Sequence, residues 1–303
     1  MAFSPNGEYL VSGHYEGVRV WRVKDGKEMA GLEVDSVHFL AVSKDGNWIA
    51  AGTLWGHVIV LNWDANGTYG QKYWWITRGP VYGLGFSPDA TRLVVASDDP
   101  TATIWDLATG NEVRGLVHEG GVYAAKYSPA GDRIATVTLY HVRVWDSEDG
   151  RLLHETQVPW SFPVGLFWVY NLLFITSKDK VCKIQGTTVL EWSIPETNET
   201  SRVALQSRGE FVVSATSRTV RFWDISTQNQ LPPIQHSQIL QSIALSPDDQ
   251  FIAIAGEDGE ITIKRLSHIS VSIIPSCIST SLLYSSFRFP VAFYLFHLTH
   301  STF

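Results

Sequence analysis

The chain has 303 residues, of which 45% are hydrophobic, and its formal net charge is -7 at pH 7. A content of 12 Trp and 14 Phe, with a mean hydropathy close to zero, is typical of a soluble, aromatic-rich β protein. The acidic balance argues against binding to nucleic acid, which needs a basic stripe. Cys182 and Cys277 lie in unlike contexts and predict no disulfide framework, so we expect an intracellular protein of the cytoplasm or nucleus.

The chain begins with two similar units of short predicted strands separated by turn residues such as Asp25-Gly26 and Asn66-Gly67. Their predicted strands are residues 8–12, 18–21, 28–34, 48–51, 58–61 and 69–76. The last of these contains Trp74 and Trp75. Strand alternation predicts that one of the two packs against the neighbouring sheet while the other faces solvent.

The following units keep this pattern with different regularity. The third is the most regular and carries the turn FSPDA at Phe86 to Ala90, whereas the fifth, at residues 162–195, is inferred mainly from spacing. The predicted strands of these units are residues 92–96, 102–105, 112–117, 122–127, 133–137, 142–145, 152–156, 172–176, 181–184, 211–215, 220–223, 239–245, 251–255 and 261–264.

A turn marker, Ser-Pro in its clearest form, recurs in steps of 38 to 44 residues. The marked positions are Ser4, Ser43, Ser87, Ser128, Trp168, Gln206 and Ser246. Each unit reads as a four-stranded antiparallel meander, which cannot bury both of its faces alone and must stack against its copies. This period favours a ring of small sheets over a sandwich or a parallel solenoid.

Residues 1–266 resemble the WD-repeat (beta-transducin-like) family. The signature dipeptide stands at Trp105-Asp106, Trp145-Asp146 and Trp223-Asp224, and Trp21-Arg22 matches half of it. The resemblance implies an all-β fold, a seven-bladed beta-propeller of four-stranded antiparallel sheets. The implied repeats lie near residues 1–35, 36–78, 79–120, 121–160, 161–200, 201–238 and 239–266.

The resemblance also implies a buried network in each blade that joins a His, an Asp, a Ser or Thr, and the Trp. The matching positions are His118, His236, Asp99, Asp258, Trp21, Trp105, Trp145 and Trp223. Thr77 takes the His place of the third blade and Leu139 takes the Asp place of the fourth. Because each blade keeps only part of the set, we expect the blades to depend on apolar packing.

The two ends predict an unusual closure of the ring. The first innermost strand is only Met1 to Phe3, and the last outer strand falls at residues 270–274, so we expect closure by side-chain packing without a sealing strand. We expect the rest of residues 267–303 to form a tail outside the propeller. We also expect the chain to be a fragment. Arg288 and Pro290 argue against a membrane-spanning helix in this tail.

The turns that join the second and third strands line one rim of a propeller, together with the loops that lead into each inner strand. Large aromatic residues in such turns are typical of interfaces. The alternative is that Trp55 and Tyr140 fold back onto their own blades. The residues expected to bind a partner on this rim are Tyr15, Glu16, Trp55, His57, Arg78, Tyr140 and His141.

The resemblance implies a non-catalytic protein-protein interaction scaffold that assembles other proteins or peptides on its rim. One alternative is a reader of a modified peptide, in which an aromatic cage holds a methylated lysine; its residues would be Tyr15, Glu16, Trp55 and Tyr140. A propeller enzyme is a further alternative. The inner strands lack convergent acids and histidines, which counts against it. We expect no catalytic residue, cofactor or metal, and neither a nucleic-acid nor a membrane partner.

Overall fold

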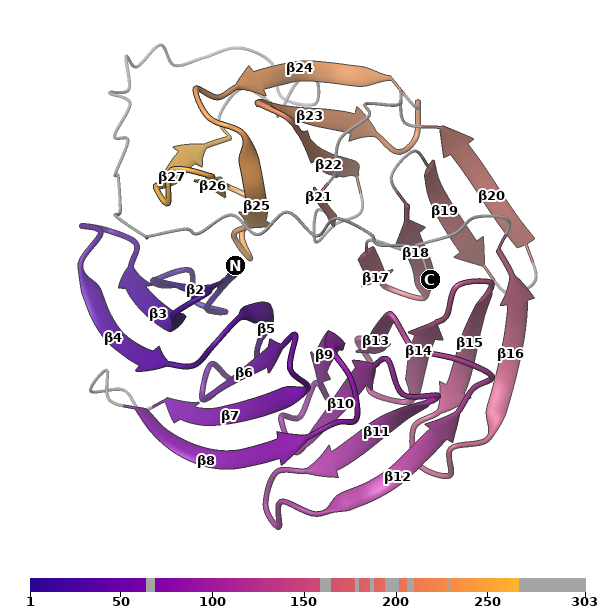
Figure 1. Cartoon of the computed structure of the whole chain (residues 1–303). Helices are drawn as coiled ribbons and strands as arrows, with labels where there is room; N and C mark the ends of the chain where they lie inside the picture. The colour runs from indigo at the N-terminus through magenta and orange to yellow at the C-terminus, as the bar shows by residue number, and fades with distance from the viewer. Residues whose placement is uncertain are drawn as a thin grey trace, which may run out of the picture.

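The structure is a computed structural model, and it describes residues 1–63, 69–158, 165–177, 180–185, 188–193, 202–205, 210–227 and 229–266. In these residues 27 strands and no helix form seven antiparallel sheets that stand in a ring (Figure 1). The predicted all-β, seven-bladed propeller is confirmed.

The first three sheets each contain four strands, paired in chain order. They consist of β1 (Ala2–Phe3), β2 (Tyr9–His14), β3 (Gly17–Arg22) and β4 (Glu28–Glu33); β5 (Val37–Val42), β6 (Trp48–Thr53), β7 (His57–Trp63) and β8 (Tyr69–Ile76); and β9 (Val81–Phe86), β10 (Arg92–Ser97), β11 (Thr101–Asp106) and β12 (Glu112–Val117).

The fourth, fifth and sixth sheets repeat this order, so the fifth unit, inferred mainly from spacing, is a genuine blade. They consist of β13 (Ala124–Tyr127), β14 (Arg133–Val137), β15 (His141–Asp146) and β16 (Leu152–Gln157); β17 (Gly165–Val169), β18 (Leu172–Thr176), β19 (Lys180–Gln185) and β20 (Thr188–Ser193); and β21 (Arg202–Leu205), β22 (Phe211–Thr216), β23 (Thr219–Asp224) and β24 (Gln230–Gln235).

The seventh sheet has three described strands, β25 (Leu240–Leu245), β26 (Phe251–Gly256) and β27 (Ile261–Arg265). The outer strand expected at residues 270–274, and the tail that follows, lie outside the described residues.

A buried serine organises the turn after the innermost strand in five sheets. Its hydroxyl accepts a hydrogen bond from the backbone N–H five residues later, at 2.9 to 3.1 Å for Ser4, Ser43, Ser87, Ser128 and Ser246. The hydroxyl also donates to an acidic or amide side chain in the turn, as from Ser87 to Asp89 at 2.5 Å. These local bonds satisfy the polar groups of the turn, which explains why Ser marks the repeat.

Apolar clusters fill the interfaces between neighbouring sheets, and seven such clusters occupy the seven interfaces of the described ring. Val58 and Val60 of the second sheet, for example, contact Leu93 and Val95 of the third. Each sheet therefore buries both of its faces against its neighbours, as the repeat pattern requires.

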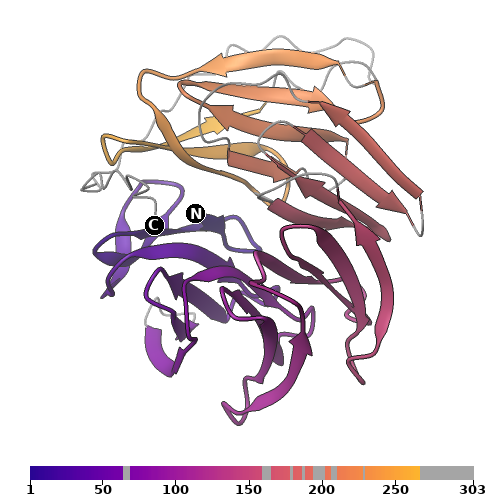
Figure 2. The ribbon, with the colours of Figure 1, turned by 45° about the vertical axis from the view of Figure 1, so that its right-hand side comes forward.

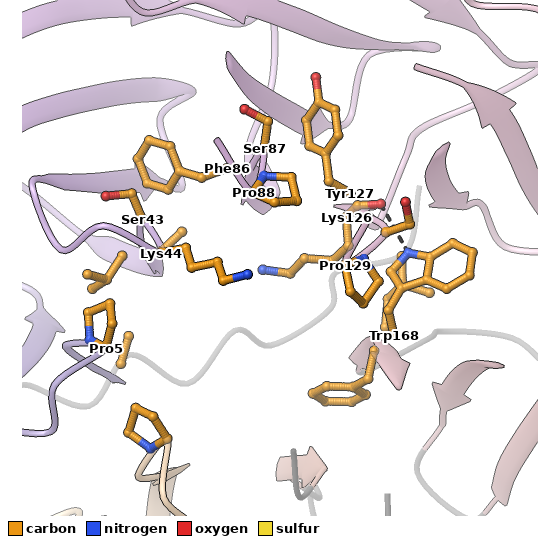
Figure 3. A pocket seen from close by; sticks show the side chains of 18 of the residues that line it. Pro5, Ser43, Lys44, Phe86, Ser87, Pro88, Lys126, Tyr127, Pro129 and Trp168 are labelled. Atoms are coloured by element: carbon orange, nitrogen blue, oxygen red, sulfur yellow. Dashed lines mark hydrogen bonds between the residues drawn. The ribbon is translucent and has the colours of Figure 1, made fainter. Parts of the chain in front are cut away.

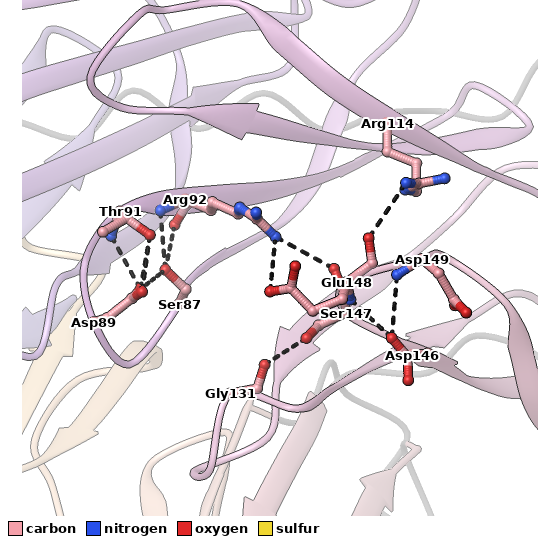
Figure 4. Close-up of polar contacts among 10 residues, drawn as sticks. All are labelled: Ser87, Asp89, Thr91, Arg92, Arg114, Gly131, Asp146, Ser147, Glu148 and Asp149. Carbon is pink, nitrogen blue, oxygen red and sulfur yellow. Dashed lines mark hydrogen bonds and ion pairs between the residues drawn. The ribbon is translucent and has the colours of Figure 1, made fainter.

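Polar contacts supplement the packing between the third and fourth sheets (Figure 4). Arg92 lies 3.5 Å from the Glu148 carboxylate and donates to the Ser147 carbonyl at 3.4 Å, while Arg114 donates to the Glu148 carbonyl at 3.3 Å. The Glu148 side chain is 80% exposed. Such exposed ion pairs contribute little, so the apolar cluster remains the main stabilising contact here.

The ring closes where the first sheet meets the seventh, side by side in Figures 1 and 2. Phe3, Leu10 and Trp21 pack there against β25, β26 and β27. No strand of the first sheet pairs with one of the seventh within the described residues, so the expected closure without a sealing strand is confirmed. Side-chain packing is not the only contact, however, because the Met1 amino group donates to Ser242 Oγ at 3.3 Å.

We expect Ile263→Ala to lower the free energy of unfolding by about 2 to 4 kcal/mol, because Ile263 is 5% exposed in this closing cluster and its truncation leaves a cavity. Denaturant unfolding measures the change. The matched control is Val113→Ala on β12, where the side chain is 45% exposed and the change should stay within about 0.5 kcal/mol. Equal losses for the two variants would contradict the role of the closing cluster.

Candidate partner-binding face

One end of the ring is formed by the turns between second and third strands and by the connections between successive sheets, which an antiparallel meander brings to the same side. We call this end the rim face. Backbone hydrogen bonds tie its loops together: Ser36 N–H donates to the Tyr15 carbonyl at 2.8 Å, and Leu54 N–H donates to the Ser36 carbonyl at 3.3 Å. Backbone hydrogen bonds therefore connect neighbouring loops of the rim face.

Three of the predicted aromatic residues stand out from this face. The side chains of Tyr15, Trp55 and Tyr140 are 46%, 67% and 59% exposed. Trp55 and Tyr140 therefore do not fold back onto their own sheets. Glu16 and Arg78 are also exposed, whereas the rings of two further predicted residues, His57 and His141, are partly buried.

The rim face also carries exposed apolar residues that the sequence analysis missed. Ile76 and Val117 end the outer strands β8 and β12 at this face and are 71% and 68% exposed. On β8 the predicted alternation is confirmed: Trp75 is 9% exposed and stacks on Trp105 at a ring distance of 4.4 Å, while Trp74 is 44% exposed. The same alternation places Ile76 on the outward side with Trp74, so the sequence pattern could have predicted the exposure of Ile76.

A hollow of about 580 Å³ lies where the first sheet meets the second. Its lining residues are Tyr15, Glu16, Arg19, Glu33, Val34, Asp35, His57 and Trp74. The rings of His57 and Trp74 are 5.1 Å apart. Glu16, Glu33 and Asp35 give its lining three carboxylates, whereas Arg19 gives it one guanidinium. This guanidinium also lies 3.3 Å from the carboxylate of Glu28. The hollow therefore suits a positively charged group that has some apolar surface.

The lining of this hollow differs from the predicted aromatic cage. Tyr15 and Glu16 line it, but Trp55 and Tyr140 do not. Trp55 lies in the turn between β6 and β7, and Tyr140 lies two sheets further around the ring, between β14 and β15. The hollow therefore gathers two of the four residues that the prediction grouped, because that grouping took residues from turns of different sheets.

A buried polar network joins His118, Thr136 and Trp145 in the fourth sheet. His118 Nδ1 lies 2.8 Å from the Leu116 carbonyl, so this nitrogen carries the proton and Nε2 accepts from the Thr136 hydroxyl at 2.8 Å. The Trp145 indole donates to the same hydroxyl oxygen at 2.8 Å. This chain of bonds holds the connection before β13 against β14 and β15.

Comparison with known proteins agrees with this geometry. The family model "WD domain, G-beta repeat" matches residues 74–106 and 230–263. The chain contains WD repeats. The two matched segments are WD repeats, as the resemblance implied.

Two curated relatives share this repeat architecture at low identity. A subunit of chromatin assembly factor 1 from Gallus gallus is 29% identical over 161 residues, which cover 52% of this chain and 25% of the relative. Serine-threonine kinase receptor-associated protein of Homo sapiens is 22% identical over 269 residues, which cover 85% and 64%. The chain thus spans a quarter of the first relative and less than two thirds of the second.

A solved structure of Kuenenia stuttgartiensis hydrazine synthase superposes with a TM-score of 0.77. It is 14% identical, and the match covers 88% of this chain and 94% of that chain. At this identity the likeness concerns the fold alone.

The remaining WD-repeat signature residues form partial networks. The indoles of Trp21 and Trp223 donate to Ser12 at 2.8 Å and to Ser214 at 3.1 Å. Asp99 accepts from the Ser97 hydroxyl and from the Arg78 backbone N–H.

Three signature positions depart from the implied network. Trp105 donates to Thr103 of its own strand at 2.9 Å instead of reaching the second strand. Among the described residues, His236 bonds to Gln238, and Asp258 is exposed in the turn after β26. For His236 and Asp258 the reason is the loss of a partner, because the seventh sheet has Lys264 at the position expected for Trp.

In the described part of the chain, no three His, Cys, Asp or Glu side chains are arranged to hold a metal ion. Nor does that part contain a helix of the length and hydropathy that crossing a membrane requires.

The stability of the WD-repeat protein should depend on pH through His118. Burial of the ring, and to a smaller extent the nearby Arg143 guanidinium, lowers the pKa of His118 to about 4 from an ordinary value near 6.5. Between these values the unfolded chain binds a proton that the folded chain rejects. The free energy of unfolding should therefore fall by roughly 2 to 3 kcal/mol as the pH drops from about 6.5 to about 4.

Denaturant unfolding at several pH values checks this. His118→Gln should be less stable than the wild type at pH 7. Its free energy of unfolding should lack the pH dependence that His118 contributes, so the difference from the wild type should shrink toward pH 4. His154→Gln, on the outer strand β16, serves as the control and should keep the slope. A deficit for His118→Gln that is constant with pH would contradict the assignment.

Proposed function

We propose that this WD-repeat protein is a non-catalytic scaffold that binds partner proteins or peptides on its rim face. The observation that carries the proposal is the exposure of Tyr15, Trp55 and Tyr140 on interlocked loops of one face. Trp and Tyr are enriched among residues that dominate binding energy, because they bury a large rigid surface and offer a polar atom. Loops that are already ordered lose little conformational entropy on binding.

The names of the relatives support this role. One belongs to a chromatin assembly factor and another is a receptor-associated protein, so both names describe association with other macromolecules. An intracellular location, in the cytoplasm or the nucleus, belongs to the same proposal. Among the described residues Cys182 is a free, buried thiol, which is compatible with a reducing, intracellular location.

We expect Trp55→Ala and Tyr140→Ala each to weaken partner binding by about 1 to 4 kcal/mol, as truncation of interface aromatics does. A partner that copurifies with the wild-type protein would be identified by mass spectrometry and then titrated calorimetrically with each variant. Both side chains are more than half exposed, so the melting temperature should hardly change.

Val113→Ala is the matched control, because Val113 is an exposed apolar residue on the outer strand β12, away from the loops of the rim face. It should leave affinity unchanged. If Trp55→Ala and Tyr140→Ala bind as tightly as this control, the rim face is not the binding surface.

The acidic hollow between the first two sheets supports a second candidate, a reader of a lysine or arginine side chain on a peptide. Glu16, Glu33 and Asp35 supply negative charge, and Tyr15 and Trp74 supply aromatic faces. A methylated lysine is one such group.

A peptide array with unmodified and trimethylated lysine tests this candidate. We expect Glu16→Gln with Asp35→Asn to reduce binding of both forms several-fold, and Trp74→Ala to reduce binding of the trimethylated form more, because cation-π attraction replaces hydrogen bonding there. Lys24→Gln, on the opposite end of the ring, is the control. Binding that survives the charge-removing substitutions would exclude the hollow.

A further inference from the structure

The end of the ring axis opposite the rim face contains a cavity of about 610 Å³, which we call the axial cavity. It is bounded by the innermost strands β1, β5, β9, β13 and β17 and by the turns that follow most of them (Figure 3). Its volume is that of an ordinary small-molecule site. The axial cavity does not share residues with the hollow at the rim face.

The walls of the axial cavity are mostly apolar, and their polar residues are three serines of the turns and two lysines. Prolines and aromatic rings, including Pro88, Pro129 and Trp168, supply the apolar surface. Lys44 and Lys126 are its charged lining residues, and Figure 3 shows their side chains extending toward one another across it. Two ammonium groups without a carboxylate among the described lining residues give this cavity a positive potential.

The acidic side chains of the turns after β5 and β9 are not among the lining residues, and they bond within their own turns. Asp45 accepts from Ser43 and from the backbone N–H of Asn47. Asp89 accepts from the Ser87 hydroxyl at 2.5 Å and from Thr91 at 2.9 Å. These carboxylates stabilise their own turns instead of pairing with the two lysines.

Lys126 is held in position but incompletely satisfied. Its Nζ donates to the Leu84 carbonyl at 2.6 Å, while its own carbonyl accepts from the Trp168 indole at 3.3 Å. An ammonium has three N–H donors, and in the described residues only the Leu84 carbonyl accepts from this one. Desolvation lowers the pKa of Lys126 to about 8, because the buried ammonium loses the stabilisation that water gives to its charge. A bound anion would restore that stabilisation.

We propose that the axial cavity binds a small organic anion, whose carboxylate or phosphate group lies between Lys44 and Lys126 and whose apolar body contacts the proline and aromatic walls. The site is separate from the rim face, so it concerns a ligand other than the proposed partner.

Pyridoxal 5′-phosphate and pyridoxal are a matched pair of probes for this site. Both carry an aldehyde, which reacts with a neutral lysine amine: the C=N bond forms, water leaves, and borohydride then delivers hydride to the imine carbon to fix the product as a secondary amine. Only the first carries the phosphate. Peptide mapping of the full chain gives the labelling rate of each lysine.

We expect the phosphate-bearing probe to label Lys126 at least ten-fold faster than pyridoxal does, after each rate is divided by that of exposed Lys24 and Lys27 in the same protein. In Lys44→Met this ratio should fall to near one, because the second ammonium is lost. Lys44 is exposed, so the variant should keep the wild-type melting temperature. A ratio near one in the wild type, or an unchanged ratio in Lys44→Met, would overturn the proposal.

Competition separates the possible sources of the anion. Protection of Lys126 by citrate or by inorganic phosphate supports the proposal and tells carboxylate from phosphate recognition. Protection only by an acidic peptide, with neither small anion effective, would overturn it in favour of a macromolecular ligand. Failure of the rim-face variants to alter partner binding has no bearing on these ratios, so the two proposals fail independently.

Discussion

Burial of apolar surface between neighbouring sheets is the constraint on which the rest of this molecule depends. A four-stranded meander of about 40 residues has too little interior to be stable alone, so each blade derives its stability from two neighbours. The incomplete hydrogen-bond networks are tolerated for this reason. The fourth sheet has a His, a Thr and a Trp joined by short bonds, whereas the seventh lacks the Trp and still packs through Ile252, Ile254 and Ile261.

The packing of the sheets also fixes the loops of the rim face in place. Strand pairing and the Ser-centred turns fix both ends of every loop, so side chains such as Trp55 can remain exposed without disordering the backbone. The two ends of the ring also differ in charge. The hollow at the rim face gathers carboxylates from the first sheet and from the connection to the second, and the axial cavity gathers two amines from the second and fourth. The two proposed sites therefore suit ligands of opposite charge.

The fold could be predicted because its determinants are local and repeated: Ser87 with its turn, the Trp-Asp ends of the third strands, and alternation within each strand. The exposure of Trp55 and Tyr140 was one of two alternatives that the sequence left open. The grouping of residues could not be predicted. His57 meets Trp74 only through the register of β7 against β8, and Lys44 reaches Lys126 only because the ring brings distant innermost strands to one axis.

The junction of the first and seventh sheets has a mechanical consequence. At the other six interfaces the polypeptide itself runs from one sheet to the next, so two sheets that separate remain tethered and repack at high effective concentration. Among the described residues no chain segment links the first sheet directly to the seventh, and Ala244, Ala253 and Ala255 make the packing of the closing interface shallow on one side. Thermal opening of the ring should therefore begin at this seam and turn the disc into an arc while the other six interfaces stay intact. A tensile load across the molecule would be borne first by Phe3, Trp21 and Ile263.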